Sequence, residues 1–109
     1  MDFNHKELDY FHIIKLSGRL DVTHSPEFEL EVQQQIDKGN HQLVIDMSGV
    51  DYISSAGLRA ILVSAKTVKK LQGEIRFCCL SDLVAEVFTI SGFQSMFKIF
   101  DTVSAATSE

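Results

Sequence analysis

The chain has 109 residues, of which 45% are hydrophobic, and its formal net charge is −5. This length allows one small core, the apolar content argues against disorder, and the acidic balance argues against a nucleic-acid surface, which needs clustered Lys and Arg. No apolar run approaches the roughly 20 residues of a membrane span, and the N-terminus lacks the basic and apolar parts of a signal peptide, so we expect a cytoplasmic protein.

The N-terminal third of the chain predicts a hairpin and then a helix. Two strands, at about 3 to 8 and 10 to 17, are joined by a tight turn. A helix over 26 to 38 follows, with Ser25 as its candidate N-cap and Gly39 at its end. The apolar stripe that should face the core consists of Phe28, Val32 and Ile36.

The middle of the chain predicts a buried strand that passes through a turn into a second helix. The strand covers 42 to 47 and is short and rich in β-branched residues, as expected of a strand covered on both faces. The helix covers 56 to 71, where apolar residues recur at helical spacing. Turn chemistry between them is supplied by Asp46, Ser48, Gly49 and Asp51.

The last third predicts a strand at 74 to 80, a short helix and a final strand at 96 to 100. Ser81 or Asp82 opens the helix and Gly92 ends it. Residues after Asp101 predict a weak helix or a frayed end. The residues of the short helix that should face inward are Leu83, Val87 and Ile90.

Strand and helix alternate three times along the chain, which favours an α/β fold. Connections between parallel strands are right-handed and place their helices on a face of the sheet. We therefore expect one domain with a mixed sheet that contains parallel strands.

The cysteines and histidines do not predict a metal or redox site. Cys78 and Cys79 are adjacent on a predicted strand, where alternation sends their side chains to opposite faces, and a disulfide between them would be strained. They are expected to be reduced and largely buried. The histidines show no ligand spacing with one another or with the cysteines; they stand at 5, 12, 24 and 41.

Two adjacent serines stand where the buried strand gives way to the second helix. Ser54, Ser55, Ala56 and Gly57 occupy the predicted helix N-terminus, where free backbone N–H groups and the helix dipole stabilise an anion such as a phosphate. The segment therefore suits a serine that can be phosphorylated. Simple helix capping is the alternative interpretation of the same pair.

Four segments in register resemble the STAS domain, the module shared by bacterial anti-sigma factor antagonists and the cytoplasmic tails of sulfate transporters. They are LSGRLD at 16–21, LVIDMSGVDYISSAGLR at 43–59, GEIRFCCLS at 73–81 and VFTISGFQSMFKIF at 87–100. The resemblance covers nearly the whole chain and implies a single STAS domain over 1–109. The implied fold is a mostly parallel central sheet with an N-terminal β-hairpin and about four flanking helices.

The resemblance also indicates which serine matters. Antagonists of this family carry a loop similar to D-S-S/T-G-L, and matching its G-L to Gly57 and Leu58 places Ser55 at the phosphoacceptor. Ser54 then stands where the family has an aspartate, and it is the competing acceptor. Ser54 retains the side-chain oxygen of an N-cap, but the lost carboxylate bears on phosphorylation efficiency.

The function implied by the resemblance is partner switching. The unphosphorylated protein would bind an anti-sigma factor that is also a serine kinase of the histidine-kinase-like ATPase fold. Phosphorylation at Ser55 would release it, and a PP2C-type phosphatase would restore the binding form. The alternative is a phosphorylation-independent STAS adaptor in a signalling or transport assembly.

The partner-binding residues expected from this reasoning include two outside the serine pair and its helix start. Asp21 matches an aspartate that lies near the serine loop in the family, and Arg59 stands one turn from Ser55. Turn capping is the alternative role for Asp21 and also for Asp46, and a solvated helix residue is the alternative for Arg59. The full set is Asp21, Ser54, Ser55, Ala56, Gly57 and Arg59.

An enzymatic role is not expected. Ser55, His24 and Asp21 supply the residue types of a hydrolase triad, but the chain has no G-x-S-x-G elbow. It also has no P-loop or dinucleotide motif, so no cofactor is predicted. Any phosphoryl transfer would be performed on this protein by a partner.

Overall fold

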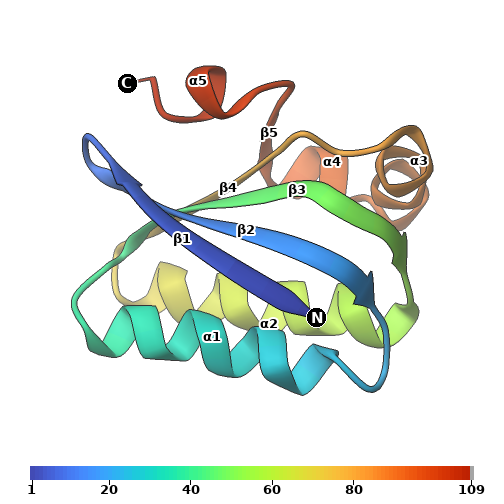
Figure 1. Cartoon of the computed structure of the whole chain (residues 1–109), viewed down its shortest axis with the longest axis horizontal. Helices are drawn as coiled ribbons and strands as arrows, with labels where there is room; N and C mark the ends of the chain where they lie inside the picture. The colour runs from blue at the N-terminus through green and yellow to red at the C-terminus, as the bar shows by residue number, and fades with distance from the viewer. Residues whose placement is uncertain (109) are drawn as a thin grey trace.

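The computed structural model describes residues 1–108 and contains one five-stranded sheet in the order β1-β2-β3-β4-β5 (Figure 1). β1 pairs antiparallel with β2, and the other neighbouring strands are parallel, which confirms the predicted mixed, mostly parallel sheet. The strands are β1 (Asp2–Leu8), β2 (Phe11–Leu20), β3 (Gln42–Ile53), β4 (Glu74–Cys78) and β5 (Lys98–Phe100). The helices are α1 (Ser25–Asp37), α2 (Ser55–Lys70), α3 (Asp82–Ser91), α4 (Phe93–Met96) and α5 (Val103–Ala106).

Helices cover both faces of the sheet, but one face carries much more helix than the other (Figure 1). α1 and α2 lie side by side against one face, while the short α5 lies over the other (Figure 1). The larger core lies between the sheet and α1 to α3, and a smaller apolar cluster lies beneath α5. The fully buried side chains of greatest volume are Phe28, Phe77 and Phe88.

The first helix agrees with the sequence pattern except at its start. Its predicted stripe is buried, with Phe28 fully inaccessible to solvent. Ser25 is not the N-cap, because the helix already begins at Ser25 and His24 stands before it. The Ser25 hydroxyl instead donates to the Asp21 carbonyl oxygen (2.5 Å), which ties the helix to the end of β2.

β2 and β3 are longer than the sequence predicted. Turn-forming residues from Asp46 to Asp51 lie within β3, and β2 continues past residue 17, its predicted end, through Gly18 to Leu20. The two strands stay paired to Leu20 and Ile53, with two register shifts on the way. A Cβ at Gly49 would lie 2.5 Å from the Leu16 carbonyl oxygen, so this glycine permits close strand contact. Residues that favour turns in isolation are held extended by pairing to a neighbour.

The predicted inward face of α3 was right for Val87, which is half-buried and packs against the main core, and wrong for the other two residues. Leu83 and Ile90 are 55% and 78% exposed, whereas Val84 and Phe88 are fully buried. Phe88 packs edge-on against Phe77, with ring centroids 5.7 Å apart, and it also contacts the ring of Phe93 in α4. Apolar residues lie on both sides of this helix, so periodicity could not choose between them. α4 also takes up the start of the predicted last strand, which begins only at 98.

The expected separation of the two cysteines was also wrong. β4 ends at Cys78, and Cys79 adopts a left-handed backbone with φ of 64°. The strand alternation therefore stops between them. Their sulfur atoms and a carboxylate oxygen of Asp46 all lie within 4.8 Å of one another.

Candidate functional site

The junction between β3 and α2 holds Ser54 in a fixed position. The Ser54 backbone N–H donates to the Leu20 carbonyl oxygen (3.0 Å), which joins the junction to the end of β2. The Ser54 hydroxyl oxygen accepts from the Gly57 backbone N–H (3.2 Å) and is the N-cap of the helix. The capping role proposed for the serine pair therefore applies to Ser54, whose side chain is half-buried.

Ser55 is the first residue of α2, and its side chain is exposed. Within residues 1–108 its hydroxyl makes no hydrogen bond to another side chain or to the backbone. It lies at the positive end of the helix dipole, beside the N–H groups of the first turn, where negative charge is favoured. The two serines thus differ in availability, because one hydroxyl is used by the fold and the other is free.

Gly57 is required by contacts within the chain. A Cβ at this position would clash with the Leu20 carbonyl oxygen and would lie 3.0 Å from Cγ1 of Ile53. The absence of a side chain therefore lets the first turn of α2 rest directly on the ends of β2 and β3. Next to it, Leu58 is half-buried and packs against the main core, as the helical period predicted.

Asp21 lies beside this junction, because it directly follows Leu20, the register partner of Ile53. Its carboxylate oxygen Oδ1 accepts from the backbone N–H of His24 (3.1 Å) and lies 2.8 Å from His24 Nδ1. Partial desolvation raises the pKa of Asp21, but the hydrogen bonds from His24 outweigh it and leave this pKa below its usual value. Asp21 therefore caps the turn into α1 and still presents negative charge at the junction.

Three further residues at this edge were missed by the sequence analysis. The Arg19 guanidinium lies 4.0 Å from the centre of the Tyr52 ring, and its Nε lies 3.8 Å from an Asp21 carboxylate oxygen. Tyr52 is 37% exposed, and Val22 is 73% exposed. The one sequence signal for a binding surface here is Tyr52, an aromatic residue two places before Ser54. Its contact with Arg19 depends on the register of β2 on β3, which the sequence does not show.

The other sequence-predicted residues divide between this edge and the interior. Arg59 is exposed one turn along α2 from Ser55, and Ala56 is half-buried between them. Asp46 lies away from the junction, 8% exposed within β3, and its Oδ1 accepts from the backbone N–H of Ser48 (2.9 Å). Asp46 therefore binds a backbone N–H as the capping interpretation expected, but it does so within a strand and not in a turn.

The residue types of a hydrolase triad are not assembled. His24 contacts Asp21, but no hydrogen bond joins His24 to Ser55 among residues 1–108. The histidines do make one contact that their spacing did not predict, across β1 and β2. His5 Nδ1 lies 2.8 Å from His12 Nε2. Burial lowers the pKa of His12, and the nearby His5 side chain lowers it further.

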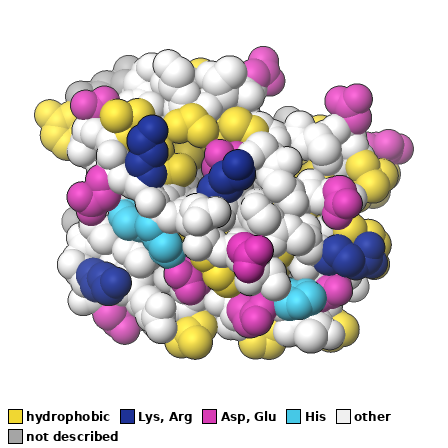
Figure 2. Space-filling model, viewed as in Figure 1, with side chains coloured by type: hydrophobic (Ala, Val, Ile, Leu, Met, Phe, Trp, Pro, Cys, Tyr) yellow, Lys and Arg dark blue, Asp and Glu magenta, His cyan; other side chains and the backbone are white. Residues whose placement is uncertain are grey.

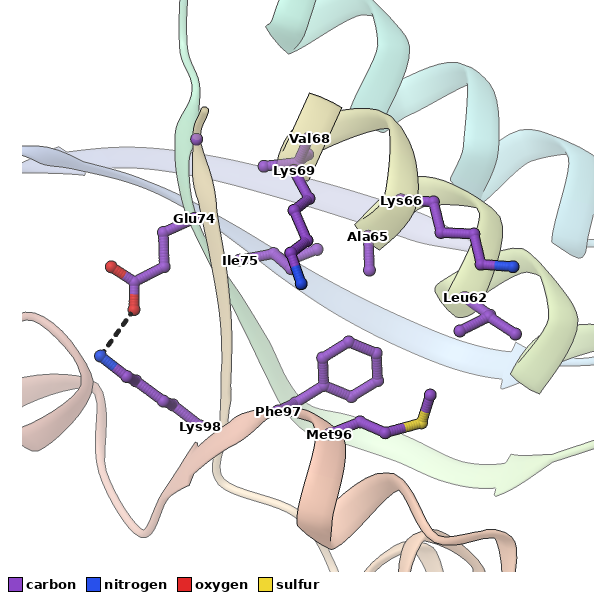
Figure 3. A pocket seen from close by; sticks show the side chains of 11 residues that line it. Leu62, Ala65, Lys66, Val68, Lys69, Glu74, Ile75, Met96, Phe97 and Lys98 are labelled. Carbon is purple, nitrogen blue, oxygen red and sulfur yellow. Dashed lines mark ion pairs between the residues drawn. The ribbon is translucent and has the colours of Figure 1, made fainter. Parts of the chain in front are cut away.

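A groove of about 610 Å³ lies at the other end of α2 and does not include the serine junction. Its apolar floor comes from α2, β4 and the segment around Phe97, and Lys66 and Lys69 extend along its rim (Figure 3). Lys98 pairs with Glu74 at 3.2 Å, and hydrogen bonds from Arg76 lower the pKa of Glu74.

On the face seen in Figure 2, acidic and basic side chains are mixed, and hydrophobic side chains gather in small groups. No helix within residues 1–108 has the length and apolar character needed to cross a membrane.

Comparison with known proteins gives a consistent assignment. The family model described as the STAS domain matches residues 2–106. A relative named "Putative anti-sigma factor antagonist BtrV", from Bordetella bronchiseptica, is 41% identical over 100 residues, covering 92% of this chain and 86% of the relative.

Solved structures share the fold at lower identity. A crystal structure titled as a putative anti-sigma factor antagonist from Thermotoga maritima has a TM-score of 0.89 at 24% identity, over 95% of this chain and 90% of that chain. SpoIIAA in its unphosphorylated form has a TM-score of 0.81 at 18% identity, over 96% of this chain and 92% of that chain. SpoIIAA from Bacillus in its phosphorylated form has a TM-score of 0.73 at 18% identity, over 96% of each chain. The family model spans nearly all of this sequence, and the chain therefore belongs to the STAS domain family.

Proposed function

We propose that this protein is an anti-sigma factor antagonist that acts by partner switching, with Ser55 as its phosphorylation site. The observation that carries the proposal is the unequal use of the serine pair. Ser54 is engaged as the helix N-cap, whereas the Ser55 hydroxyl is exposed and free at the helix start. The name of the Bordetella relative supports the antagonist role.

In the unphosphorylated state, the protein binds an anti-sigma factor that is also a serine kinase of the histidine-kinase-like ATPase fold. The contact surface comprises the edge described above and the first turn of α2. A sigma factor is released when this contact forms, and the setting is the cytoplasm. The residues that contribute are Asp21, Ser54, Ser55, Ala56, Gly57 and Arg59, with Arg19, Val22 and Tyr52 beside them.

Phosphorylation of Ser55 then breaks the contact. A phosphoserine carries about −1.5 to −2 charges at neutral pH, and placing them in an interface that fitted a neutral hydroxyl brings desolvation and like-charge repulsion. Within the free protein the same group is well accommodated, because it stands at a helix N-terminus with Arg59 one turn away. The phosphorylated form is therefore stable alone and binds the partner poorly. A PP2C-type phosphatase removes the phosphate and restores the binding form.

The test is phosphorylation by the cognate kinase with ATP, read by intact-protein and peptide mass spectrometry. Wild type and Ser54→Ala should each gain one phosphate at Ser55, and Ser55→Ala should gain none. The Ser54→Ala variant is the matched control, since it removes the neighbouring hydroxyl. Phosphate on Ser54 in the Ser55→Ala protein would move the site by one residue.

Binding is tested separately by calorimetric titration of the same kinase with wild type and Ser55→Asp in the presence of nucleotide. Ser55→Asp should bind at least about tenfold more weakly, because one charge enters the interface, although it carries less charge than phosphoserine. Its midpoint temperature of thermal unfolding should equal or exceed that of wild type. Equal affinities of wild type and Ser55→Asp for the kinase would contradict the proposal that charge at position 55 controls binding.

One observation favours the alternative, a phosphorylation-independent adaptor in a signalling or transport assembly. Ser54 stands at the position of the aspartate in the family pattern, so the loop has no carboxylate next to Ser55. An adaptor would bind its partner equally well with serine, alanine or aspartate at position 55. In both cases the protein is a binding module and catalyses no reaction.

A further inference from the structure

Asp46, Cys78 and Cys79 come together where β3 and β4 pair, on the sheet face that α5 covers. Asp46 and Cys78 are register partners in neighbouring parallel strands, and Cys79 directly follows. One carboxylate oxygen and the two sulfur atoms all lie within 4.8 Å of one another. These residues belong to no part of the proposed binding edge.

The backbone at Cys79 is what brings the two thiols together. Its φ of 64° lies in the left-handed region, which is sterically unfavourable for a residue with a Cβ. A regular strand would send the Cys79 side chain to the opposite face from Cys78. The Cys79 backbone N–H donates to the Phe100 carbonyl oxygen (3.1 Å), which helps to hold this conformation. A strained backbone that assembles three ligand groups indicates a functional site.

The cluster is rich in groups that bind cations and poor in positive charge. Asp46 is 8% exposed, and within residues 1–108 no Lys, Arg or His side chain forms an ion pair with it. The backbone N–H of Ser48 donates to Oδ1 of Asp46 and fixes the orientation of the carboxylate, as outer-shell partners do at metal sites. Burial raises the pKa of both thiols.

We propose that Asp46, Cys78 and Cys79 form a binding site for one thiophilic divalent cation of the Zn²⁺ or Cd²⁺ class. Two thiolates and a carboxylate are a donor set that such ions accept, with the fourth position left to water. On binding, the cation displaces one proton from each thiol, so that two protons are released to solvent. No electron is transferred, and the carboxylate keeps its charge.

The spacing of the three groups fits one ion. Zinc–sulfur and zinc–oxygen bonds of about 2.3 and 2.1 Å place tetrahedral ligand atoms about 3.5 to 3.8 Å apart. The limit of 4.8 Å therefore leaves at most about 1.3 Å to close, which small side-chain rotations supply. Cys79 is only half-buried, so the ion has a route from solvent beside α5.

The test uses reduced protein and the metal alone. Titration with CdCl₂ should saturate at one ion per chain, with ultraviolet thiolate-to-cadmium charge transfer, and CoCl₂ should give the corresponding sulfur-to-cobalt band. Cys79→Gly removes one thiol and suits the left-handed backbone, so it should fold, as far-ultraviolet circular dichroism will show. Its affinity for Cd²⁺ should fall at least about 100-fold, more than an outer-shell change costs.

Two further variants separate this site from other ligands on the chain. Asp46→Asn keeps an oxygen that can accept from Ser48 but removes the charge, and it should weaken Cd²⁺ binding at least about tenfold. His5→Gln alters the histidine pair across β1 and β2 and should leave the affinity unchanged. Binding without the charge-transfer band, or equal affinity in wild type and Cys79→Gly, would overturn the proposal.

Discussion

The carboxyl ends of β3 and β4 each carry a pair of adjacent side chains, serines in one case and cysteines in the other. The pairing of Asp46 with Cys78 shows that β3 continues to Ile53 after β4 has ended. Ser54 and Ser55 therefore lie beyond the end of β4, next to the end of β2. Cys78 and Cys79 stay beneath α5.

The local backbone also differs between the two ends. Ser54 has an extended backbone and caps a sixteen-residue helix, so the strain at this end is low and one hydroxyl is left free. Cys79 has a left-handed backbone, and both sulfur atoms lie within 4.8 Å of a carboxylate oxygen of Asp46. In parallel sheets, sites lie beyond the carboxyl ends of the strands. Here strand length decides whether that position becomes an exposed surface or an enclosed cluster.

The largest effect is expected at the β3 end, from Gly57→Val. The added side chain would clash with the Leu20 carbonyl oxygen and crowd Ile53, so the free energy of unfolding should fall by about 3 kcal/mol or more. Urea unfolding followed by circular dichroism measures this. Arg59→Val, exposed in the same helix, should cost only about 0.5 kcal/mol and controls for β-branched propensity. Similar losses in the two variants would show that the helix does not rest on the strand ends.

The strain at the β4 end is tested by comparing Cys79→Ala with Cys79→Gly in metal-free protein. Both variants lose the thiol, but only glycine adopts positive φ without steric cost. Cys79→Ala should therefore be less stable than Cys79→Gly by about 1 kcal/mol in urea unfolding. If alanine is the more stable of the two, the left-handed backbone is not strained.

The division of roles within the serine pair predicts unequal losses of stability. Ser54→Ala removes the acceptor of the Gly57 N–H and should lower the free energy of unfolding by about 1 kcal/mol. Ser55→Ala should change it by less than about 0.5 kcal/mol, since the hydroxyl is exposed. Thermal and urea unfolding of both variants measure the difference. A larger loss for Ser55→Ala would reverse the assigned roles.

The smallest effect is expected from Asp21, whose pKa is lower in the folded protein than its ordinary value. A carboxyl group with a depressed pKa stabilises the fold at neutral pH, and this contribution is lost as the pH falls through the folded pKa. The stability difference between wild type and Asp21→Asn should therefore shrink below about pH 4. Urea unfolding between pH 7 and pH 3 measures it, and a difference that does not change with pH would contradict the prediction.

Local sequence patterns predicted much of the fold for identifiable reasons. The stripe of α1 and the cap of α2 depend on residues three or four places apart, so helical periodicity and capping chemistry predict them. The position of the serine pair at a helix start was predicted from the strand-to-helix pattern, and the nearness of Asp21 to it was predicted from the STAS resemblance. Their common cause is visible in the structure, where Leu20 and Ile53 end paired strands at the same edge.

The remaining features depend on contacts between residues far apart in the chain. Pairing with β2 holds the turn-forming residues of β3 extended, and packing against Phe77 selects Val84 and Phe88 over Leu83 as the inward face of α3. The Asp46–Cys78–Cys79 cluster likewise requires the register of β3 on β4 and the backbone turn at Cys79. The sequence alone determined most of the elements, the N-caps of α2 and α3, and the candidate serines. Only the tertiary structure decided which polar groups are exposed and which meet, because burial and strand register arise from long-range packing.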